Sequence, residues 1–376
     1  MTEPTHPNDF LSREQLAGYI PKNLKDKRVF ICGVGAFGQN LVLTLALTGL
    51  RQMALVDCGA FEGSNRTRSP FYTAGAPKAA SVGRELLRFA RADRPDIRFY
   101  NGHLQEVIDA AIAWADVVIS AVDSDEARAL LAARCLLHNM PLIEGGFWGF
   151  DLSMAVFPGE ESTAPCWQCG RELPEDGGQR GLCSLYAASV EEAGAVPATQ
   201  SVAQFLGALV AESAIAALHG RFPHAHRRWF LNLRTGRSIR AALSHDSECP
   251  NPHTVLNPED IVDLEVSFTD TVFDLVQALE QLGEHPALHL PDPFWLHLPC
   301  RKCGASLPVL LPQWAIQEAP CCPGGCLPEN HGAEFALPES VLTLGPGTDL
   351  FAMSCWQVGL GPGAIAPVAW ADGTQR

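Results

Sequence analysis

Three glycines between an apolar segment and a helical pattern set the strongest limit on how this chain folds. Gly33, Gly35 and Gly38 have the spacing G-x-G-x-x-G and follow directly on the apolar residues 28–32. Glycine permits a tight turn from strand to helix and lets a phosphate approach the N–H groups that begin the helix. Asp57 ends the next apolar segment, where a carboxylate accepts hydrogen bonds from a ribose. The pattern predicts a nucleotide-binding α/β fold.

Strand and helix patterns alternate along the chain as far as residue 145. This alternation predicts a Rossmann-like, doubly wound, mostly parallel sheet covered on both faces. Right-handed crossovers then place the carboxyl ends of the parallel strands at one edge, where ligands bind. We expect strands at 28–32, 52–57, 96–101, 116–122, 141–144, 151–157 and 228–233. We expect helices at 36–48, 78–91, 104–114 and 200–218, and a further helix that follows the strand at 116–122 and ends at residue 138.

Length and composition predict the organisation of the chain and exclude some partners. A chain of 376 residues exceeds one hydrophobic core, and the composition shifts toward Pro, Leu and Cys near residue 255. We therefore expect one domain at 1–254 and a smaller one at 255–376. The net charge of −15 argues against non-specific nucleic-acid binding but not against a basic protein partner. We find no membrane-spanning window and no signal peptide, so we expect a cytoplasmic protein without membrane contact.

Two cations beyond the second strand indicate which class of nucleotide-binding enzyme the chain resembles. Arg68 and Lys78 follow that strand and are placed to clamp the charge of a polyphosphate. A nicotinamide-dependent oxidoreductase, the alternative favoured by the glycines alone, has no need of them. Asp123 follows another buried strand and is a candidate Mg²⁺ ligand beside the phosphates. The alternative for Asp123 is an N-cap of the helix that begins near Glu126.

The motifs in this order resemble a known family. G-x-G-x-x-G, L-V-D at 55–57, S-N-x-x-R at 64–68, G-x-P-K at 75–78 and the later strand-end Asp resemble the ubiquitin-activating superfamily, which includes the ThiF and MoeB enzymes. The resemblance covers roughly residues 10–254. It implies a homodimeric enzyme that uses ATP and Mg²⁺ to adenylate the C-terminal glycine of a ubiquitin-like protein.

The resemblance also implies roles for single residues. Asp57 contacts the ribose of ATP, and Gly35 and Gly38 line the phosphate turn. The triphosphate is bound by Asn65, Arg68 and Lys78, and Asp123 positions Mg²⁺. Arg13, in the N-terminal arm, occupies the place of an arginine that reaches the ATP of the partner protomer.

The chain departs from the family pattern at two positions. Gly59 stands where the family often has the second acid of D-x-D, and Ser124 stands where it has an Asn. Asp125 is an additional acid, which we expect to be able to share the metal. Neither departure removes a phosphate-binding cation, so ATP use remains the prediction.

Paired cysteines predict zinc. Cys166-x-x-Cys169 and a downstream segment with Cys249 and His253 supply a Cys pair and a Cys/His pair, a donor set that suits tetrahedral zinc. The family often has a second C-x-x-C here, but position 252 is Pro. His253 is therefore the predicted fourth ligand.

The C-terminal segment has a second cysteine set. Its spacing resembles a zinc ribbon, which predicts zinc on Cys300, Cys303, Cys322 and Cys326, with the adjacent Cys321 as surplus. We interpret the remaining cysteines outside the metal sets as structural, with the exception of Cys183. This interpretation covers Cys32, Cys58 and Cys135 in apolar strand or helix patterns, and Cys355 near the C-terminal end.

Cys183 is the candidate nucleophile. It lies in a Gly-rich segment outside both cysteine sets, where Arg180 favours the thiolate, and ThiF-like enzymes place a sulfur-handling cysteine in a similar position. We predict that its thiol captures the adenylate and that a conjugating enzyme receives the product, by analogy with bacterial ubiquitin-like systems linked to phage defence. The alternatives are sulfur-carrier activation for thiamin or molybdopterin synthesis, and a zinc scaffold with an inactive nucleotide site.

Overall fold

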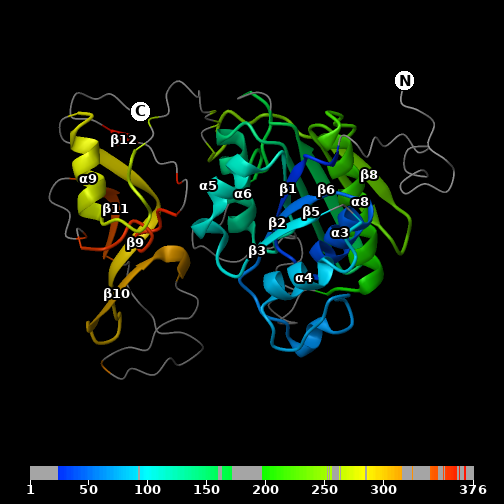
Figure 1. Cartoon of the computed structure of the whole chain (residues 1–376), viewed down its shortest axis with the longest axis horizontal. Helices are drawn as coiled ribbons and strands as arrows, with labels where there is room; N and C mark the ends of the chain where they lie inside the picture. Colours follow the sequence, from blue (N-terminus) through cyan, green and yellow to red (C-terminus); the bar gives the residue numbers. More distant parts are fainter. Residues whose placement is uncertain are drawn as a thin grey trace. The chain divides into compact units, whose positions relative to one another are not determined.

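The computed structural model separates the chain into two compact units, which are described individually (Figure 1). One comprises residues 1–104 with 111–256, and the other residues 105–110 with 257–376. The structure describes residues 24–91, 94–159, 163–171, 197–251, 253, 255, 262, 264–283, 286–315, 324, 339–345, 350, 352–361, 364 and 368–369.

The first unit is built on a single sheet of eight strands in the order β3-β2-β1-β4-β5-β6-β7-β8. The pairs from β3 to β5 are parallel, and the pairs from β5 to β8 are antiparallel. The predicted α/β class with a mostly parallel, Rossmann-like arrangement is confirmed. The strands are β1 (Arg28–Cys32), β2 (Gln52–Val56), β3 (Asp96–Tyr100), β4 (Val117–Ser120), β5 (Leu142–Trp148), β6 (Asp151–Phe157), β7 (Arg227–Asn232) and β8 (Ser238–Ala242).

Helices cover both faces of this sheet (Figure 1). On one face α3 (Ala36–Leu47), α4 (Lys78–Leu86) and α8 (Gln200–Leu218) enclose the main apolar core with strand residues such as Ile31 and Met154. On the opposite face lies α6 (Asp125–Leu137), and its Arg128 reaches Glu144 on β5. Successive strand residues alternate between faces, so the buried strands are apolar on both sides.

The prediction that no segment is long and apolar enough to span a membrane needs one correction. Among the described helices, α8 is long and apolar enough to cross a membrane by length and composition. However, 67% of its most apolar window is buried inside the protein, where it packs on α3 and β5. Its apolar composition is therefore that of a core helix, because a buried helix is apolar on most of its surface.

Several predicted boundaries differ from the structure. The predicted helix at 78–91 ends at Leu86, and the predicted helix at 104–114 divides into a 3-10 turn, η2 (Leu104–Glu106), and α5 (Ile108–Trp114). The strand predicted at 141–144 extends to Trp148, because it forms a hairpin with β6. β8 was not predicted, since none of its side chains is fully buried and an exposed strand leaves no apolar pattern.

The described residues of the second unit form a small sheet with one α-helix. Its strands β9 (Ala287–Pro299), β10 (Ser306–Pro312), β11 (Glu339–Leu344) and β12 (Val368–Ala369) are arranged around β9. Helix α9 (Val272–Glu280) begins with a capping box in which Thr271 and Asp274 bind each other's backbone N–H groups. Its buried Leu275 and Leu279 join the core of this unit.

Candidate functional site

The glycine turn joins β1 to α3. Gly33 has a φ of +86°, and a Cβ on it would lie 2.5 Å from the carbonyl oxygen of Ala121, so only glycine fits. A Cβ on Gly38 would overlap the carbonyl oxygen of Gly33. At Gly35 nothing lies within 4 Å of an added Cβ, and no side chain caps the start of α3. The N-terminus of α3 is therefore open to an anion such as phosphate.

Asp57 follows β2 and closes the turn from the other side. Its Oδ2 accepts a hydrogen bond from the N–H of Val34, and its Oδ1 accepts one from the N–H of Gly59, both at 2.8 Å. Burial raises the pKa of this carboxyl, and the positive charge of Lys78 opposes the shift. The carboxylate thus holds the glycine turn in place, and its remaining lone pairs suit a ribose hydroxyl.

Lys78 is brought to Asp57 by a short antiparallel contact. Ala60 pairs with Pro77, and the N–H of Lys78 donates to the carbonyl of Gly59 at 2.9 Å. A Cβ on Gly59 would lie 2.9 Å from the Nζ of Lys78. Glycine at position 59, where the family often has the second acid of D-x-D, therefore leaves room for the ammonium group of Lys78.

Arg68 lies in the loop that leads from β2 to α4. The 3-10 turn η1 (Gly63–Asn65) is fixed by Asn65, whose Oδ1 accepts from the N–H of Glu62 at 3.0 Å. The Nη1 of Arg68 donates to the carbonyl of Ser64 at 2.6 Å. Within the described part of the chain Arg68 forms no ion pair, so its guanidinium has further N–H groups for phosphate oxygens.

Gln39 is a positioning residue that the sequence analysis missed. Its buried side chain donates from Nε2 to the carbonyls of Val34 (3.0 Å) and Gly35 (3.2 Å). The same Nε2 lies 3.2 Å from the Ser69 hydroxyl, and Oε1 accepts from the N–H of Phe71 at 3.2 Å. One amide thus fastens the loop that holds Arg68 to the glycine turn. A glutamine in the first turns of a helix gave no signal, because its partner Ser69 in the loop lies 30 residues further along.

Replacing Gln39 by alanine is expected to lower kcat/KM of the ATP-dependent reaction about tenfold, the equivalent of about 1.4 kcal/mol. The reason is that the N–H of Phe71 loses its acceptor and the Arg68 loop loosens. Asn40→Ala is the matched control, since this neighbouring buried amide binds Gln200 on α8 instead. In a double mutant with Arg68→Ala, the Gln39 effect should largely vanish. Additive effects, or an equal loss in Asn40→Ala, would contradict the positioning role.

Asp123 lies at the edge where β4 ends. The structure corrects its alternative assignment, because Ser124 is the N-cap of α6 and accepts from the N–H of Ala127 at 3.2 Å. Asp123 is exposed and forms no hydrogen bond or ion pair with the residues that the structure describes. It is close enough to Asp57 for its charge to raise the pKa of that carboxyl. An exposed carboxylate beside the phosphate turn fits a Mg²⁺ ligand.

Asp125 is bound to another side chain, which corrects the expectation that it can share the metal with Asp123. Its carboxylate binds Arg128 at 3.0 Å, and that guanidinium also donates to the carbonyl of Val122 at 2.6 Å. Burial raises the pKa of Asp125, and Arg128 opposes the shift. Asp125 therefore helps to hold the turn that carries Asp123 rather than a metal ion.

A buried ion cluster continues from this pair into the sheet. Glu144 on β5 is fully buried between Arg128 (Nε to Oε1, 3.3 Å) and Arg228 on β7 (Nη1 to Oε2, 2.8 Å). Arg171 lies nearby, and burial together with the charge of Arg228 lowers its pKa to about 10. No local pattern marks this cluster, because Arg228 and Glu144 are 84 residues apart in the chain.

The four predicted zinc ligands of the first set lie together. The donor atoms of Cys166, Cys169, Cys249 and His253 are all within 4.8 Å of one another. The Sγ atom of Cys166 is 3.7 Å from that of Cys249 and 3.9 Å from that of Cys169. A tetrahedral site with Zn–S bonds of about 2.3 Å has S···S edges of about 3.8 Å. The spacing therefore fits zinc.

The surroundings of these donors also fit a metal. The N–H groups of Cys166 and Gln168 point to the sulfurs of Cys169 and Cys166, each at 3.3 Å, an arrangement that stabilises thiolates. Burial raises the pKa of Cys249 to about 12, and the neighbouring Cys166 adds to the shift. Such thiols ionise at neutral pH when a cation binds them. The Oδ1 of Asn251 accepts from the N–H of His253 at 3.3 Å.

We expect the purified chain to carry two zinc ions per protomer, one in each cysteine set. The physical reason is that each set offers four soft or borderline donors. Metal analysis under reducing, chelator-free conditions measures the content, and Cys166→Ser and Cys300→Ser each remove one ion. Finding no zinc would reject both sites, and a single ion that survives Cys300→Ser would reject the ribbon.

The second cysteine set is described only in part. Cys300 is buried and Cys303 is exposed, at the turn between β9 and β10. Cys322 and Cys326 lie outside the described residues, as do Arg13 and Cys183. Their assigned roles stay predictions.

The other cysteines within the described ranges are free thiols. Cys32, Cys135 and Cys355 are buried, as an apolar setting predicts. Cys58 is exposed in the turn after β2, and its assignment to an apolar pattern was wrong. The strand ends two residues earlier, at Val56, so Cys58 leaves the sheet.

Comparison with known proteins agrees with the fold. The model of the ThiF family matches residues 14–251. The protein named SAMP-activating enzyme E1 of Haloferax volcanii is 30% identical over 169 residues, which cover 41% of this chain and 57% of that protein. The sulfur carrier protein ThiS adenylyltransferase of Bacillus subtilis is 29% identical over 253 residues, covering 64% of this chain and 70% of that protein.

A solved structure has a similar fold. E. coli MccB, in its crystal structure with MccA-N7isoASN, aligns with a TM-score of 0.56 and 17% identity. The alignment covers 66% of this chain and 76% of that chain. At this identity the likeness concerns the fold alone.

Proposed function

Because the chain belongs to the ThiF family, we propose that it adenylates the C-terminal glycine of a ubiquitin-like protein with ATP. The observation that carries this proposal is the convergence at one sheet edge of an open helix N-terminus, the Asp57 carboxylate and the cations Arg68 and Lys78. The relatives named SAMP-activating enzyme E1 and sulfur carrier protein ThiS adenylyltransferase support the reaction type. The oxidoreductase alternative leaves the two cations without a role.

The residues present fit this chemistry. The start of α3 and Gly35 receive the phosphates, and Asp57 holds the ribose. Mg²⁺, held by Asp123, supplies charge neutralisation on the phosphates when bound. Arg68, Asn65 and Lys78 hold the triphosphate, and the two cations stabilise the charge that develops on the leaving pyrophosphate.

The proposed reaction has two steps. A carboxylate oxygen of the glycine attacks the α-phosphorus of ATP, the bond from that phosphorus to the bridging oxygen breaks, and pyrophosphate leaves. The thiolate of Cys183 then attacks the carbonyl carbon of the acyl-adenylate, a thioester forms and AMP leaves. Hand-over to a conjugating enzyme follows in this scheme.

Sulfur-carrier activation for thiamin or molybdopterin synthesis is the second candidate. The match to the ThiS adenylyltransferase of B. subtilis covers more of this chain than the match to the SAMP-activating enzyme, which favours it. Both candidates share the adenylation step and differ in the fate of the product. We further propose a cytoplasmic homodimer in which Arg13 reaches the partner's ATP.

Pyrophosphate exchange tests the adenylation. The purified chain is assayed with MgATP and three carriers with a C-terminal glycine, namely ThiS, a molybdopterin-synthesis sulfur carrier and a SAMP protein. Exchange with at least one carrier and none without it is the expected result. Tight binding of NAD with no exchange would reject the proposal, and ATP binding without turnover would favour the inactive zinc scaffold.

Cys183→Ala is expected to keep pyrophosphate exchange but to lose a reductant-sensitive adduct with the carrier on non-reducing gels. The reason is that the thiol acts only after pyrophosphate has left. Cys58→Ala, which removes an exposed thiol outside the cysteine sets, is the control and should keep the adduct. Survival of the adduct in Cys183→Ala would move the role to another thiol. Loss of exchange as well would mean that Cys183 supports the fold or the ATP site.

A further inference from the structure

The predicted zinc-binding turn, residues 166–171, packs against helix α6 through a buried tryptophan. Trp167 stands between the two cysteines of the C-x-x-C motif and is only 1% exposed. It lines one small cavity together with three residues of α6, namely Ala132, Cys135 and Leu136. The zinc-binding turn and the C-terminal half of α6 are therefore close neighbours.

One face of α6 joins this contact to the ion pair at the start of the helix. Four of its buried residues follow one another at intervals of three or four positions, namely Asp125, Arg128, Ala132 and Cys135. Residues at this spacing lie on the same face of a helix. The face that meets Trp167 near the end of α6 therefore continues to Asp125 and Arg128 near its beginning.

Arg171 extends from the zinc-binding turn toward the beginning of α6. Its Cζ atom lies over the ring of Trp167, 4.2 Å from the ring centroid, a contact that stabilises a partly desolvated cation. The guanidinium is also close enough to Asp125 for the two charges to act on each other. The backbone before Arg171 is fixed, because the N–H of Gly170 donates to Oδ2 of Asp246 at 3.2 Å.

The beginning of α6 in turn holds the segment that carries Asp123. Arg128 binds Asp125 at 3.0 Å, and its Nη2 donates to the carbonyl of Val122 at 2.6 Å. Val122 also lies against the glycine turn, since a Cβ on Gly33 would be 3.1 Å from its backbone N. A displacement of Arg128 therefore changes the place of Asp123 beside the phosphate turn.

We propose that Arg171 is a positioning residue that supports Asp125 and Arg128 from the zinc-binding turn and thereby holds Asp123 in place for a divalent cation. This inference rests on the proposed function, which assigns Mg²⁺ to Asp123. Arg171 touches neither the cation nor ATP, so its whole effect passes through the Asp123 carboxylate. The cation is a hard one, for which carboxylate oxygen is a preferred ligand.

The test measures binding of Mn²⁺, as a probe for the cation, by electron paramagnetic resonance. The full chain is used with an ATP analogue that cannot be cleaved between its α- and β-phosphates. Arg171→Ala is expected to raise the Kd for Mn²⁺ about tenfold, because partners that orient a metal ligand carry affinity of that order. Arg171→Lys should have a smaller effect, since lysine keeps the charge but loses the planar stacking surface. Both variants should keep the zinc content of the unchanged chain.

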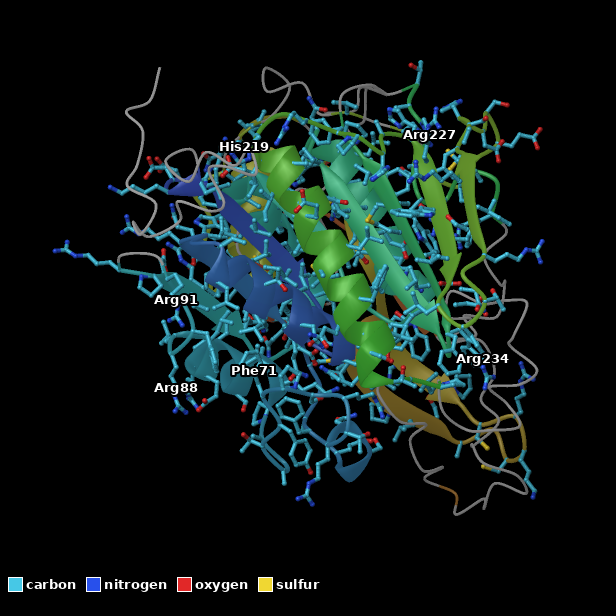
Figure 2. All side chains as sticks on the ribbon, turned by 90° about the vertical axis from the view of Figure 1, so that its right-hand side faces the viewer. Phe71, Arg88, Arg91, His219, Arg227 and Arg234 are labelled. Carbon is cyan, nitrogen blue, oxygen red and sulfur yellow. The ribbon has the colours of Figure 1, made fainter. Side chains whose placement is uncertain are left out.

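Arg240→Ala is the matched control. Arg240 is exposed, and its Cζ atom lies 4.5 Å from the ring centroid of Trp229, so this change also removes an arginine from a tryptophan. The control pair belongs to the hairpin of β7 and β8, and Figure 2 shows Arg227 and Arg234 near the two ends of that hairpin. Arg240→Ala should leave the Kd for Mn²⁺ unchanged.

A double mutant tests the route through Asp123. Asp123→Asn should weaken Mn²⁺ binding by itself, and the addition of Arg171→Ala should weaken it little further. In pyrophosphate exchange, Arg171→Ala should raise the Mg²⁺ concentration that gives the half-maximal rate, while the rate at saturating Mg²⁺ recovers. A residue that only supports the fold would not separate these two quantities.

Other outcomes separate this inference from the proposed function. An unchanged Kd for Mn²⁺ in Arg171→Ala, additive effects with Asp123→Asn, or an equal loss in Arg240→Ala overturns the positioning role and leaves the function standing. Loss of zinc together with Mn²⁺ affinity in Arg171→Ala assigns the residue to the zinc site and overturns the role as well. Arg171-dependent Mn²⁺ binding without exchange on any carrier overturns the function alone. An unchanged chain that binds no Mn²⁺ with the analogue overturns both.

Discussion

Arg68→Ala is expected to lower the rate of pyrophosphate exchange by about 10²–10³, because one preorganised donor to developing charge is lost. Among the residues that the structure describes, the guanidinium is held only by the Ser64 carbonyl, so its other N–H groups are available for the proposed contacts with phosphate. Initial-rate assays with saturating carrier and varied ATP measure the effect. The loss should lie in kcat as well as KM, since the interaction strengthens in the transition state.

Arg66→Ala is the control for this change. Arg66 is exposed and lies two residues earlier in the same loop, and its backbone N–H bonds to the carbonyl of Gly63. Its replacement tests whether the loss of any cation from this loop lowers the rate of pyrophosphate exchange. Arg68→Lys should recover part of the rate, because lysine keeps the charge but loses the planar fork. Unchanged exchange in Arg68→Ala would remove the phosphate-binding assignment of this loop.

Glu144→Ala is expected to lower the free energy of unfolding by about 3–5 kcal/mol, because it leaves two buried guanidiniums without their shared carboxylate. Glu144 is 0% exposed, and both Arg128 and Arg228 bind it. Urea denaturation of the apo chain under reducing conditions measures the change. The Asp123 turn should also loosen, since Arg128 holds the Val122 carbonyl.

An exposed ion pair supplies the comparison. Glu85→Ala breaks the contact with Arg88 at 2.9 Å, where both side chains are largely exposed, and should change stability by less than about 1 kcal/mol. If Glu144→Ala lowers the free energy of unfolding as little as Glu85→Ala does, water screens the charges of the cluster. Replacing Glu144, both arginines and Asp125 together by apolar residues should cost less than the single change, because these paired charges are then removed together.

Local chemistry accounts for the parts of the site that could be predicted. Gly33 and Gly38 were predictable because the turn admits no Cβ there, which restricts the residue type at each position. Lys78 and Asp57 were placed at one edge because parallel strands end together. The zinc ligands Cys166 and Cys169 were visible as a pair three residues apart, a spacing that one turn brings together.

Other parts depend on contacts between distant segments. Gln39 reaches Phe71, Arg228 reaches Glu144, and Gln200 reaches Asn40. These long-range partners lie at neither helix nor strand spacing, so no periodic pattern marks the contacts. Near neighbours corrected two other expectations, because Ser124 rather than Asp123 caps α6, and Arg128, three residues along the helix, binds Asp125.

The sequence by itself determined the α/β class, the nucleotide turn and its cations, because each depends on residue type at short spacing along the chain. Only the tertiary structure decided the antiparallel extension through β8 and the buried Arg128–Glu144–Arg228 cluster. The physical reason is that pairing register and burial arise when segments far apart in the chain pack together. Such packing selects partners by complementarity in space, which local sequence patterns do not record.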